Sequence, residues 1–184
     1  VVEDPCFLSS ISMLRYSGFN ACPVEIDNEG LVADKLELAL AKGARAVILT
    51  PRAHNPTGYS LSAARAAAIQ QVLSRYPQVL VIVDDHFALL SSAAWHPVLT
   101  PQTQHSQCGS QWVSHLLQDL VYACLTDEAY QRTLAQFRQF YASQQQKLAQ
   151  ALCQHGVGHV REGDGLNLWL PLSAPSQSTA FALA

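Results

Sequence analysis

The segment from residue 46 to residue 90 constrains the fold of this chain more than any other part of it. Two short apolar runs, residues 46–49 and 79–83, flank an alanine-rich amphipathic stretch at residues 62–75. Two β-branched runs on either side of one helix-length stretch are typical of a strand–helix–strand unit with parallel strands. Parallel strands are usually covered on both faces and are therefore uninterruptedly apolar, as these runs are. The sequence predicts an α/β fold with a mainly parallel sheet.

Further elements are predicted before this central unit. Residues 8–17 and 32–41 carry apolar side chains at helical spacing, and residues 22–26 alternate as a short strand does. Glycines follow both helices, as is common at helix ends. In the second helix we expect the inward side chains to be Leu36, Leu38, Ala39 and Leu40.

The pattern changes after residue 90. Residues 95–109 are rich in Pro, Gln, Thr and His and show no periodicity, which is unusual for a connection inside a domain. A helix is predicted over residues 111–125, and Thr126 is expected to cap a second, longer helix that ends before Gly156. The apolar stripe of the longer helix is expected to consist of Tyr130, Leu134, Phe137, Phe140, Tyr141, Leu148 and Leu152.

These elements indicate two regions. Residues 165–172 alternate and predict a strand of a second, α+β region. We therefore expect an incomplete large domain in residues 1–125, followed in residues 126–184 by a long linking helix and a partial α+β small domain.

Composition narrows the possible functions. The chain has 184 residues and a formal net charge of −3, without a basic run of the kind that binds nucleic acid. It contains no apolar stretch long enough to span a bilayer. The cysteines are odd in number and contain no Cys-x-x-Cys pair, which favours reduced thiols and a cytoplasmic location; they are Cys6, Cys22, Cys108, Cys124 and Cys153.

Polar residues follow both runs of the central unit, where parallel sheets place their ligands. Asn55 lies in an Asn-Pro-Thr-Gly turn after the first run, and its amide can both donate and accept a hydrogen bond. Asp84 ends the second run and is placed to hold a ring nitrogen protonated. Either motif alone fits an ordinary turn. A metal site at Asp84, Asp85 and His86 is disfavoured because neighbouring strand residues point to opposite faces.

Taken together and in order, five motifs resemble one family. They are residues 2–7 (VEDPCF), 50–58 (TPRAHNPTG), 83–87 (VDDHF), 110–116 (SQWVSHL) and 165–171 (GLNLWLP). The chain resembles the fold-type-I aminotransferases, which bind pyridoxal 5′-phosphate (PLP). More narrowly, it is similar to the aminotransferase-like domain of the MocR transcription regulators of the GntR superfamily.

The resemblance implies roles for four residues in binding PLP. Asn55 would contact the phenolic O3′ of the cofactor, and Asp84 would pair with its pyridine nitrogen. Phe7 is placed to stack on the ring. Members of the family often have a tyrosine after the aspartate pair, whereas this chain has His86 and Phe87. Of these two, only His86 could supply a hydrogen-bond donor to O3′.

The chain departs from the family at other positions. Its lysines are Lys35, Lys42 and Lys147, and none lies in the Ser-x-x-Lys context of the family's Schiff-base lysine, which would be expected near residues 105–107. By the same resemblance, the phosphate-binding loop would precede Val1, and the arginine for the substrate carboxylate would follow residue 184. We therefore expect either a fragment or a chain from which interior residues are missing.

Two functions from different classes follow from the resemblance. The first is a sensor domain that binds PLP or a related B6 vitamer and biases a winged-helix DNA-binding domain that is absent from this chain. The second is a PLP-dependent aminotransferase acting on an amino or keto acid. A scaffold with an inactive cofactor site is a third possibility. A homodimer is expected from the resemblance alone.

Overall fold

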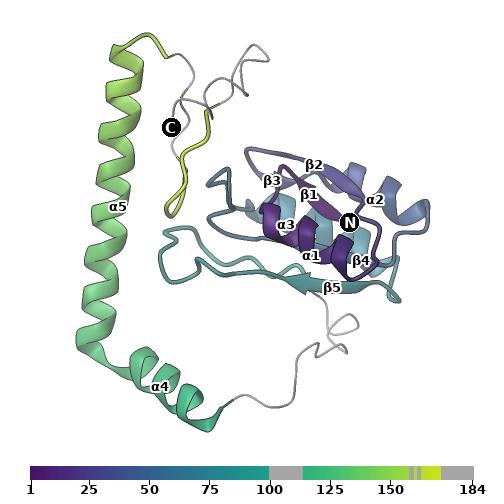
Figure 1. Ribbon diagram of the computed structural model, residues 1–184, viewed down its shortest axis with the longest axis horizontal. Helices are drawn as coiled ribbons and strands as arrows, with labels where there is room; N and C mark the ends of the chain where they lie inside the picture. Colours follow the sequence, from purple (N-terminus) through teal and green to yellow (C-terminus); the bar gives the residue numbers. More distant parts are fainter. Residues whose placement is uncertain (100–113, 158–159, 161–162, 171–184) are drawn as a thin grey trace.

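The computed structural model describes residues 1–99, 114–157, 160 and 163–170 (Figure 1). Within this part of the chain the strands are short and lie in its first half. They are β1 (Val2–Asp4), β2 (Pro23–Asp27), β3 (Gly30–Leu31), β4 (Ala46–Leu49) and β5 (Leu80–Val83).

The strands confirm the predicted parallel sheet. β4 and β5 pair in parallel from Ala46 with Leu80 to Leu49 with Val83, and β1 pairs in parallel with β2, whereas β3 turns back antiparallel to β2. The amide of Ile48 donates to the carbonyl of Val1 at 3.0 Å, which joins β4 to the β1 side. The carboxyl ends of β1, β4 and β5 consequently lie along one edge.

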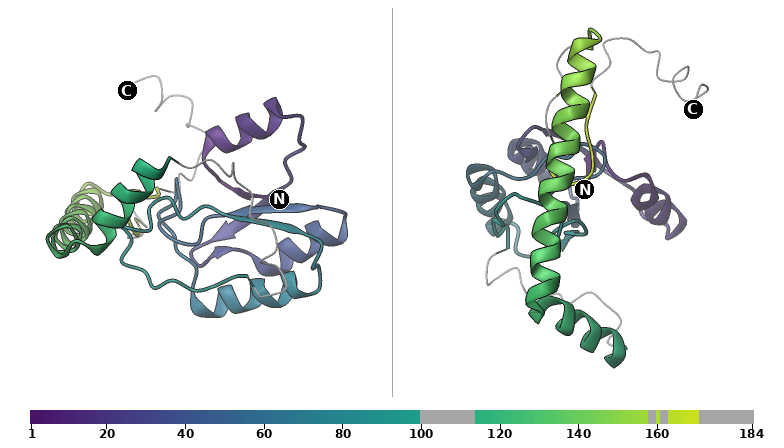
Figure 2. Two further views of the ribbon diagram at one scale, coloured as in Figure 1. Left: turned by 90° about the horizontal axis from the view of Figure 1, so that it is seen from below. Right: turned by 90° about the vertical axis from the view of Figure 1, so that its left-hand side faces the viewer.

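Three helices accompany the sheet: α1 (Leu8–Tyr16), α2 (Ala33–Ala41) and α3 (Ala63–Ser74). Figure 2 shows α2 and α3 together on one side of the strands and α1 on the other. The helix α3 lies within the stretch predicted over residues 62–75, and the Ser62 side chain caps it by accepting a hydrogen bond from the Arg65 amide at 3.0 Å.

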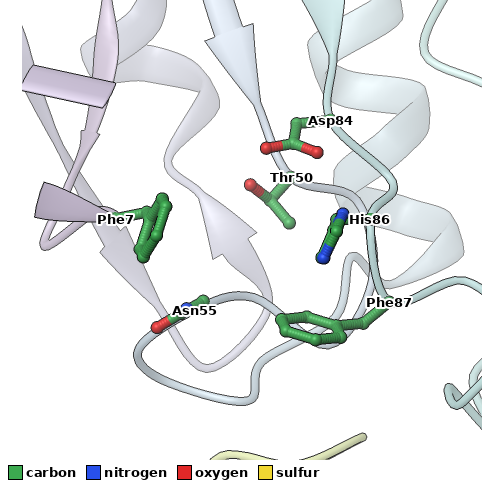
Figure 3. Close-up of a pocket in the computed structure, with 6 residues that line it drawn as sticks. All are labelled: Phe7, Thr50, Asn55, Asp84, His86 and Phe87. Atoms are coloured by element: carbon green, nitrogen blue, oxygen red, sulfur yellow. The ribbon is translucent and has the colours of Figure 1, made fainter. Parts of the chain in front are cut away.

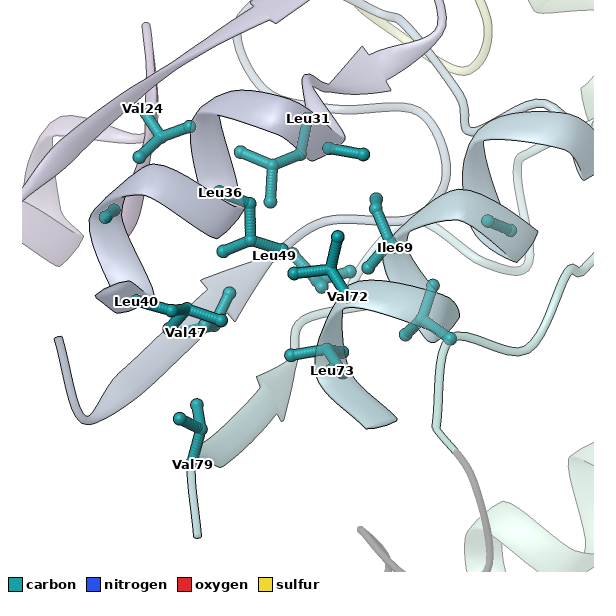
Figure 4. Close-up of a cluster of buried hydrophobic side chains, with 14 of the residues drawn as sticks. Val24, Leu31, Leu36, Leu40, Val47, Leu49, Ile69, Val72, Leu73 and Val79 are labelled. Carbon is teal, nitrogen blue, oxygen red and sulfur yellow. The ribbon is translucent and has the colours of Figure 1, made fainter. Parts of the chain in front are cut away.

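The hydrophobic core lies between the sheet and the pair of helices α2 and α3 (Figure 4). Burial of large aliphatic side chains is its main source of stability, at about 1.5–3 kcal/mol for each side chain removed from water. Its most completely buried members are Leu31, Leu36, Val47, Leu49, Ile69, Leu73 and Val98.

Two expectations about burial are wrong. Leu38 was predicted to face inward but is 56% exposed, because Leu36, Ala39 and Leu40 already form the inward stripe and a residue two positions from Leu36 lies on the other side of a helix. Ile82 in β5 is 38% exposed. Within the described residues, the face of the sheet on the side of α1 is therefore only partly covered.

The second half contains α4 (His115–Thr126) and the long α5 (Glu128–Gln154), as expected apart from the cap. Thr126 is the last residue of α4, and its hydroxyl donates to the Tyr122 carbonyl at 2.8 Å. Asp127 caps α5 instead, since its carboxylate accepts from the Tyr130 amide at 2.6 Å. An ionised carboxylate is a stronger acceptor than a hydroxyl and also suits the helix dipole. Residues 111–113 of the predicted helix lie outside the described residues.

The apolar stripe of α5 is only partly covered. Leu134 is buried, whereas Phe137, Phe140 and Leu148 are exposed. Figure 1 shows α5 standing to one side of the sheet. None of the helices in the described ranges is both long and apolar enough to cross a membrane.

The strand predicted over residues 165–172 is not observed in residues 163–170. Residues 164–166 form a bend and turn, and only Trp169 makes an isolated bridge. The alternation of the sequence is therefore not sufficient for a strand without a neighbouring ladder. Residues 171–172 lie outside the described part, and the proposed domain boundary after residue 125 remains a prediction.

Candidate functional site

A pocket of about 190 Å³ opens at the carboxyl ends of β1, β4 and β5. It contains all four residues that the sequence singled out, together with a threonine and a second phenylalanine. The lining residues are Phe7, Thr50, Asn55, Asp84, His86 and Phe87 (Figure 3).

The strands bring these residues together from distant parts of the sequence. Thr50 directly follows β4 and Asp84 directly follows β5, so the parallel pairing of the two strands places both at the same edge. Phe7 comes from the segment between β1 and α1. This edge is where open parallel sheets bind ligands.

The pocket has an aromatic side and a polar side. In Figure 3, Phe7 lies across the opening from Asp84, Thr50 and His86, Asn55 lies below Phe7, and Phe87 lies below His86. The His86 ring meets the Phe87 ring edge-on with centroids 4.9 Å apart. This arrangement offers a flat apolar face, a carboxylate and an amide to one planar ligand.

A buried polar cluster beneath the pocket fixes the loop that carries Asn55. The Thr50 amide donates to Oε2 of Glu3 at 2.9 Å, and Nδ1 of His54 lies 2.8 Å from the hydroxyl of Thr57. Nε2 of His54 is 3.3 Å from Oε2 of Glu3, within electrostatic reach but without hydrogen-bond alignment. The side chains of Glu3 and His54 therefore tie the ends of β1 and β4 to the Asn55 turn.

The turn also requires a glycine. Gly58 has a φ of 70°, in the left-handed region that favours glycine. A Cβ at this position would lie 2.4 Å from the carbonyl oxygen of Asn167 and 3.1 Å from Cα of Gly163. The Asn55 turn is thus packed directly against residues 163–167 from the far end of the chain.

Arg52, which precedes the Asn55 turn in the sequence, has a partner within the protein. Its Nε donates to Oδ1 of Asp85 at 3.2 Å, and its guanidinium lies 5.3 Å from the ring centroid of Trp95. Asp85 is therefore occupied by Arg52. Among the described residues, the neighbouring Asp84 forms no ion pair and lines the pocket.

A second polar centre, Asp164, was not identified from the sequence. Its carboxylate accepts hydrogen bonds from Ser60, Ser91 and Ser92. Burial by itself raises the pKa of Asp164, but these hydrogen bonds outweigh burial and hold the pKa below its usual value. The only sequence signal was an Asp-Gly turn, which is common on protein surfaces.

Comparison with known proteins identifies the family. Residues 1–106 match the model of the family described as aminotransferase class I and II. Solved aspartate aminotransferases have the same fold: a Thermus thermophilus tetra mutant gives a TM-score of 0.72 over 89% of this chain and 55% of its own, at 15% identity. The enzyme from Rhizobium meliloti gives 0.68 over 89% of this chain and 51% of its own, at 19% identity. The predicted fold-type-I aminotransferase-like fold is confirmed.

The curated relatives include transcription regulators. The chain is 58% identical to the vitamin B6 salvage pathway transcriptional repressor PtsJ of Salmonella typhimurium, in a match that covers 100% of this chain and 50% of PtsJ. It is 33% identical to the HTH-type regulator YjiR of Escherichia coli, over 57% of this chain and 22% of YjiR. The chain thus spans half the length of these relatives or less. The PtsJ match runs over 216 residues, against 184 in this chain, so PtsJ has additional residues inside the matched region.

Proposed function

The chain belongs to the aminotransferase class I and II family, and on this premise we propose that it is the PLP-binding effector domain of a MocR-type transcription regulator that senses a B6 vitamer. The single observation that carries the proposal is the pocket, because it gathers Phe7, Asn55, Asp84 and His86 around one ring-sized space. The identity to PtsJ over the whole chain supports a regulator.

The residues fit the chemistry of the cofactor. Phe7, half exposed at the pocket, offers a face on which a pyridine ring stacks. The carboxylate of Asp84 holds the ring nitrogen protonated, and Asn55 and His86 donate to the phenolic oxygen. When bound, PLP supplies an electron-accepting ring. The residues of this chain bind and orient that ring.

Non-covalent binding distinguishes this proposal from transamination. The lysines of the chain are Lys35, Lys42 and Lys147. Lys35 lies in α2, Lys42 at its C-terminal cap and Lys147 in α5, and none of them lines the pocket. An aminotransferase needs a lysine at the cofactor to form the covalent link and move the proton. The additional residues of PtsJ within the matched region are where we place the missing lysine segment.

The wider assignments rest on the relatives. We propose that DNA binding belongs to a winged-helix domain outside this chain, that the protein acts in the cytoplasm, and that it forms a homodimer. Occupancy of the pocket regulates such a protein only to the extent that PLP binds its two states with different affinities.

Titration of the protein with PLP, followed by intrinsic fluorescence, tests the proposal. We expect saturable binding, weakened about tenfold or more by Asp84→Asn, because a hydrogen bond to a charged group contributes about 1.5–3 kcal/mol. Asn55→Ala is expected to weaken it severalfold. Asp34→Asn, which makes the same change on the exposed side of α2, is the matched control and should bind as the parent does. Absence of binding, or equal affinity of all variants, would contradict the proposal.

The absence of a covalent link has its own test. Borohydride reduction at one equivalent of PLP, followed by peptide mass spectrometry, should give no stoichiometric adduct on Lys35, Lys42 or Lys147. A stoichiometric adduct on one of them that disappears in Asp84→Asn would show that a lysine reaches the pocket and would favour the aminotransferase.

A further inference from the structure

Both loops that carry pocket residues are bonded to one carboxylate outside the pocket. We define the Asn55 loop as residues 53–60 and the His86 loop as residues 84–93. We propose that Asp164 is a positioning residue that clamps these two loops to a turn held by α5 and thereby couples the pocket to the long helix. The hydrogen bonds described below support the clamp itself, whereas its coupling to ligand binding rests on the proposed function.

The Asn55 loop reaches Asp164 in two ways. The hydroxyl of Ser60 donates to Oδ2 of Asp164 at 2.9 Å and accepts from the Ala53 amide at 2.9 Å. The Asp164 amide donates to the Gly58 carbonyl at 2.6 Å. Both ends of the Asn55 loop are therefore connected to Asp164, so its position fixes the position of the loop.

The His86 loop is attached by the same chemistry. The hydroxyl of Ser91 donates to the same Oδ2 atom and accepts from the Ala93 amide at 3.1 Å. The amide and hydroxyl of Ser92 donate to Oδ1 at 2.8 Å and 3.0 Å. The two loops thus share one acceptor group, and neither can leave it without breaking hydrogen bonds to a charge.

The donors explain why the residue must be an ionised aspartate. The Gly165 amide also donates to Oδ1, at 3.0 Å, so every described partner of the carboxylate donates and all are neutral. An asparagine would offer one acceptor oxygen and would present an NH₂ group where a second acceptor is needed. Hydrogen bonds to an ionised group are also about twice as strong as neutral ones.

The long helix holds the other side of the clamp. Nε2 of Gln145, a buried side chain on α5, donates to the carbonyls of Gly165 at 2.8 Å and Asn167 at 3.2 Å. Nε of Arg138, two turns earlier on α5, donates to the Leu89 carbonyl of the His86 loop at 2.8 Å. The turn that carries Asp164 is therefore fixed to the same helix that contacts the His86 loop.

These contacts give a physical route from the pocket to α5. A ring held between Asn55 and His86 sets the spacing of the two loops, and the Asp164 carboxylate sets the same spacing from the other side. Ligand binding and closure of the clamp then favour each other, which is the reciprocal coupling that linkage requires. Movement of either loop is transmitted to α5 through Gln145 and Arg138.

Amide hydrogen exchange of the protein without ligand tests the clamp. In Asp164→Asn we expect the amides of Ser92 and Ala53 to exchange about tenfold faster or more, because both depend on hydrogen bonds that end at the carboxylate. Ser60→Ala should accelerate Ala53 but leave Ser92 unchanged. The matched control is Asp127→Asn, the same substitution at the cap of α5, which should leave both amides unchanged. The clamp is refuted if Asp164→Asn leaves the two loops as protected as before.

Exchange with saturating PLP tests the coupling. In the parent protein we expect PLP to slow exchange in the Asn55 loop and in residues 138–149 of α5. In Asp164→Asn the Asn55 loop should still be protected at saturation, whereas the protection around Gln145 should be lost; the contact of Arg138 with Leu89 does not pass through Asp164 and should persist. Protection around Gln145 that persists in Asp164→Asn would refute the coupling. If PLP protects neither region of the parent protein, the proposed function and the coupling fail together, while the ligand-free result still decides the clamp.

Discussion

The buried pair of Glu3 and His54 gives the most quantitative prediction. His54 is 2% exposed and Glu3 is 4% exposed, and they lie 3.3 Å apart beneath the pocket. In His54→Ala the Glu3 carboxylate keeps the Thr50 amide as a partner but loses the ring that faces it. Leaving a buried polar group without its partner costs about 1–3 kcal/mol. This is a large fraction of a total stability of about 5–15 kcal/mol.

The physical cause can be separated from simple loss of packing by a double-mutant cycle. Glu3→Gln removes the charge and keeps the shape, so in the double variant no unpaired carboxylate remains. We expect the double variant to be less destabilised than the sum of the two single variants by about 1–3 kcal/mol, in the range seen for contacting residues.

Urea unfolding followed by far-ultraviolet circular dichroism measures all four proteins of the cycle. Additive effects, within about 0.5 kcal/mol, would refute the argument that Glu3 and His54 act as a pair. If His54→Ala does not fold, His54→Phe replaces it in the cycle, because it removes both ring nitrogens and keeps an aromatic ring at the same position.

Three further predictions concern the fold and its pH dependence. The Arg65 side chain, hydrogen-bonded to Asp27, holds the pKa of Asp27 below its usual value. The stability from this pair is therefore present above the unfolded-state pKa and is lost as pH falls through the lower folded-state pKa. Arg65→Ala should flatten the acid side of a stability–pH curve measured by urea unfolding, and an unchanged curve would contradict this. Leu36→Ala should lower the free energy of unfolding by about 2–5 kcal/mol, whereas Leu38→Ala should lower it by less than about 1 kcal/mol because Leu38 is exposed. Equal losses of stability in thermal melts would contradict the assignment of Leu36 to the buried face of α2 and of Leu38 to its exposed face. Gly58→Ala should both destabilise the fold and weaken PLP binding, because its Cβ would meet the Asn167 carbonyl at 2.4 Å; a fully stable variant in the same melts would show that residues 163–167 do not pack there.

Local pattern was sufficient to predict the central unit and the pocket. The two apolar runs form β4 and β5 in the expected parallel pairing. Because ligands bind at the carboxyl ends of such strands, Asn55 and Asp84 were predicted to lie in one site, and both line the pocket. Phe7 and His86 were assigned from the family resemblance, and the structure places them in the same pocket. Their roles in binding PLP stay predictions.

What the sequence did not predict depends on contacts between distant residues. Nothing near Asp164 indicates that Ser60 and Ser91, 104 and 73 residues away, donate to it. The pairing of Glu3 with His54 likewise joins two strand ends that only the tertiary fold brings together. The strand predicted over residues 165–172 is an over-prediction. Its alternating sequence was taken as sufficient for a strand, whereas residues 163–170 form only an isolated bridge and no ladder with a neighbouring strand.

The contact between Asp84 and the ring nitrogen of PLP is the central claim, and a ligand analogue tests it most directly. The measurement is the ratio of the dissociation constants of PLP and of its 1-deaza analogue, in which carbon replaces the ring nitrogen, for the parent protein and for Asp84→Ala. We predict that the parent prefers PLP about tenfold or more, as expected for a hydrogen bond to a charged group, and that Asp84→Ala abolishes the preference. Equal affinity of the parent for the two ligands, or a preference that survives in Asp84→Ala, would contradict the account.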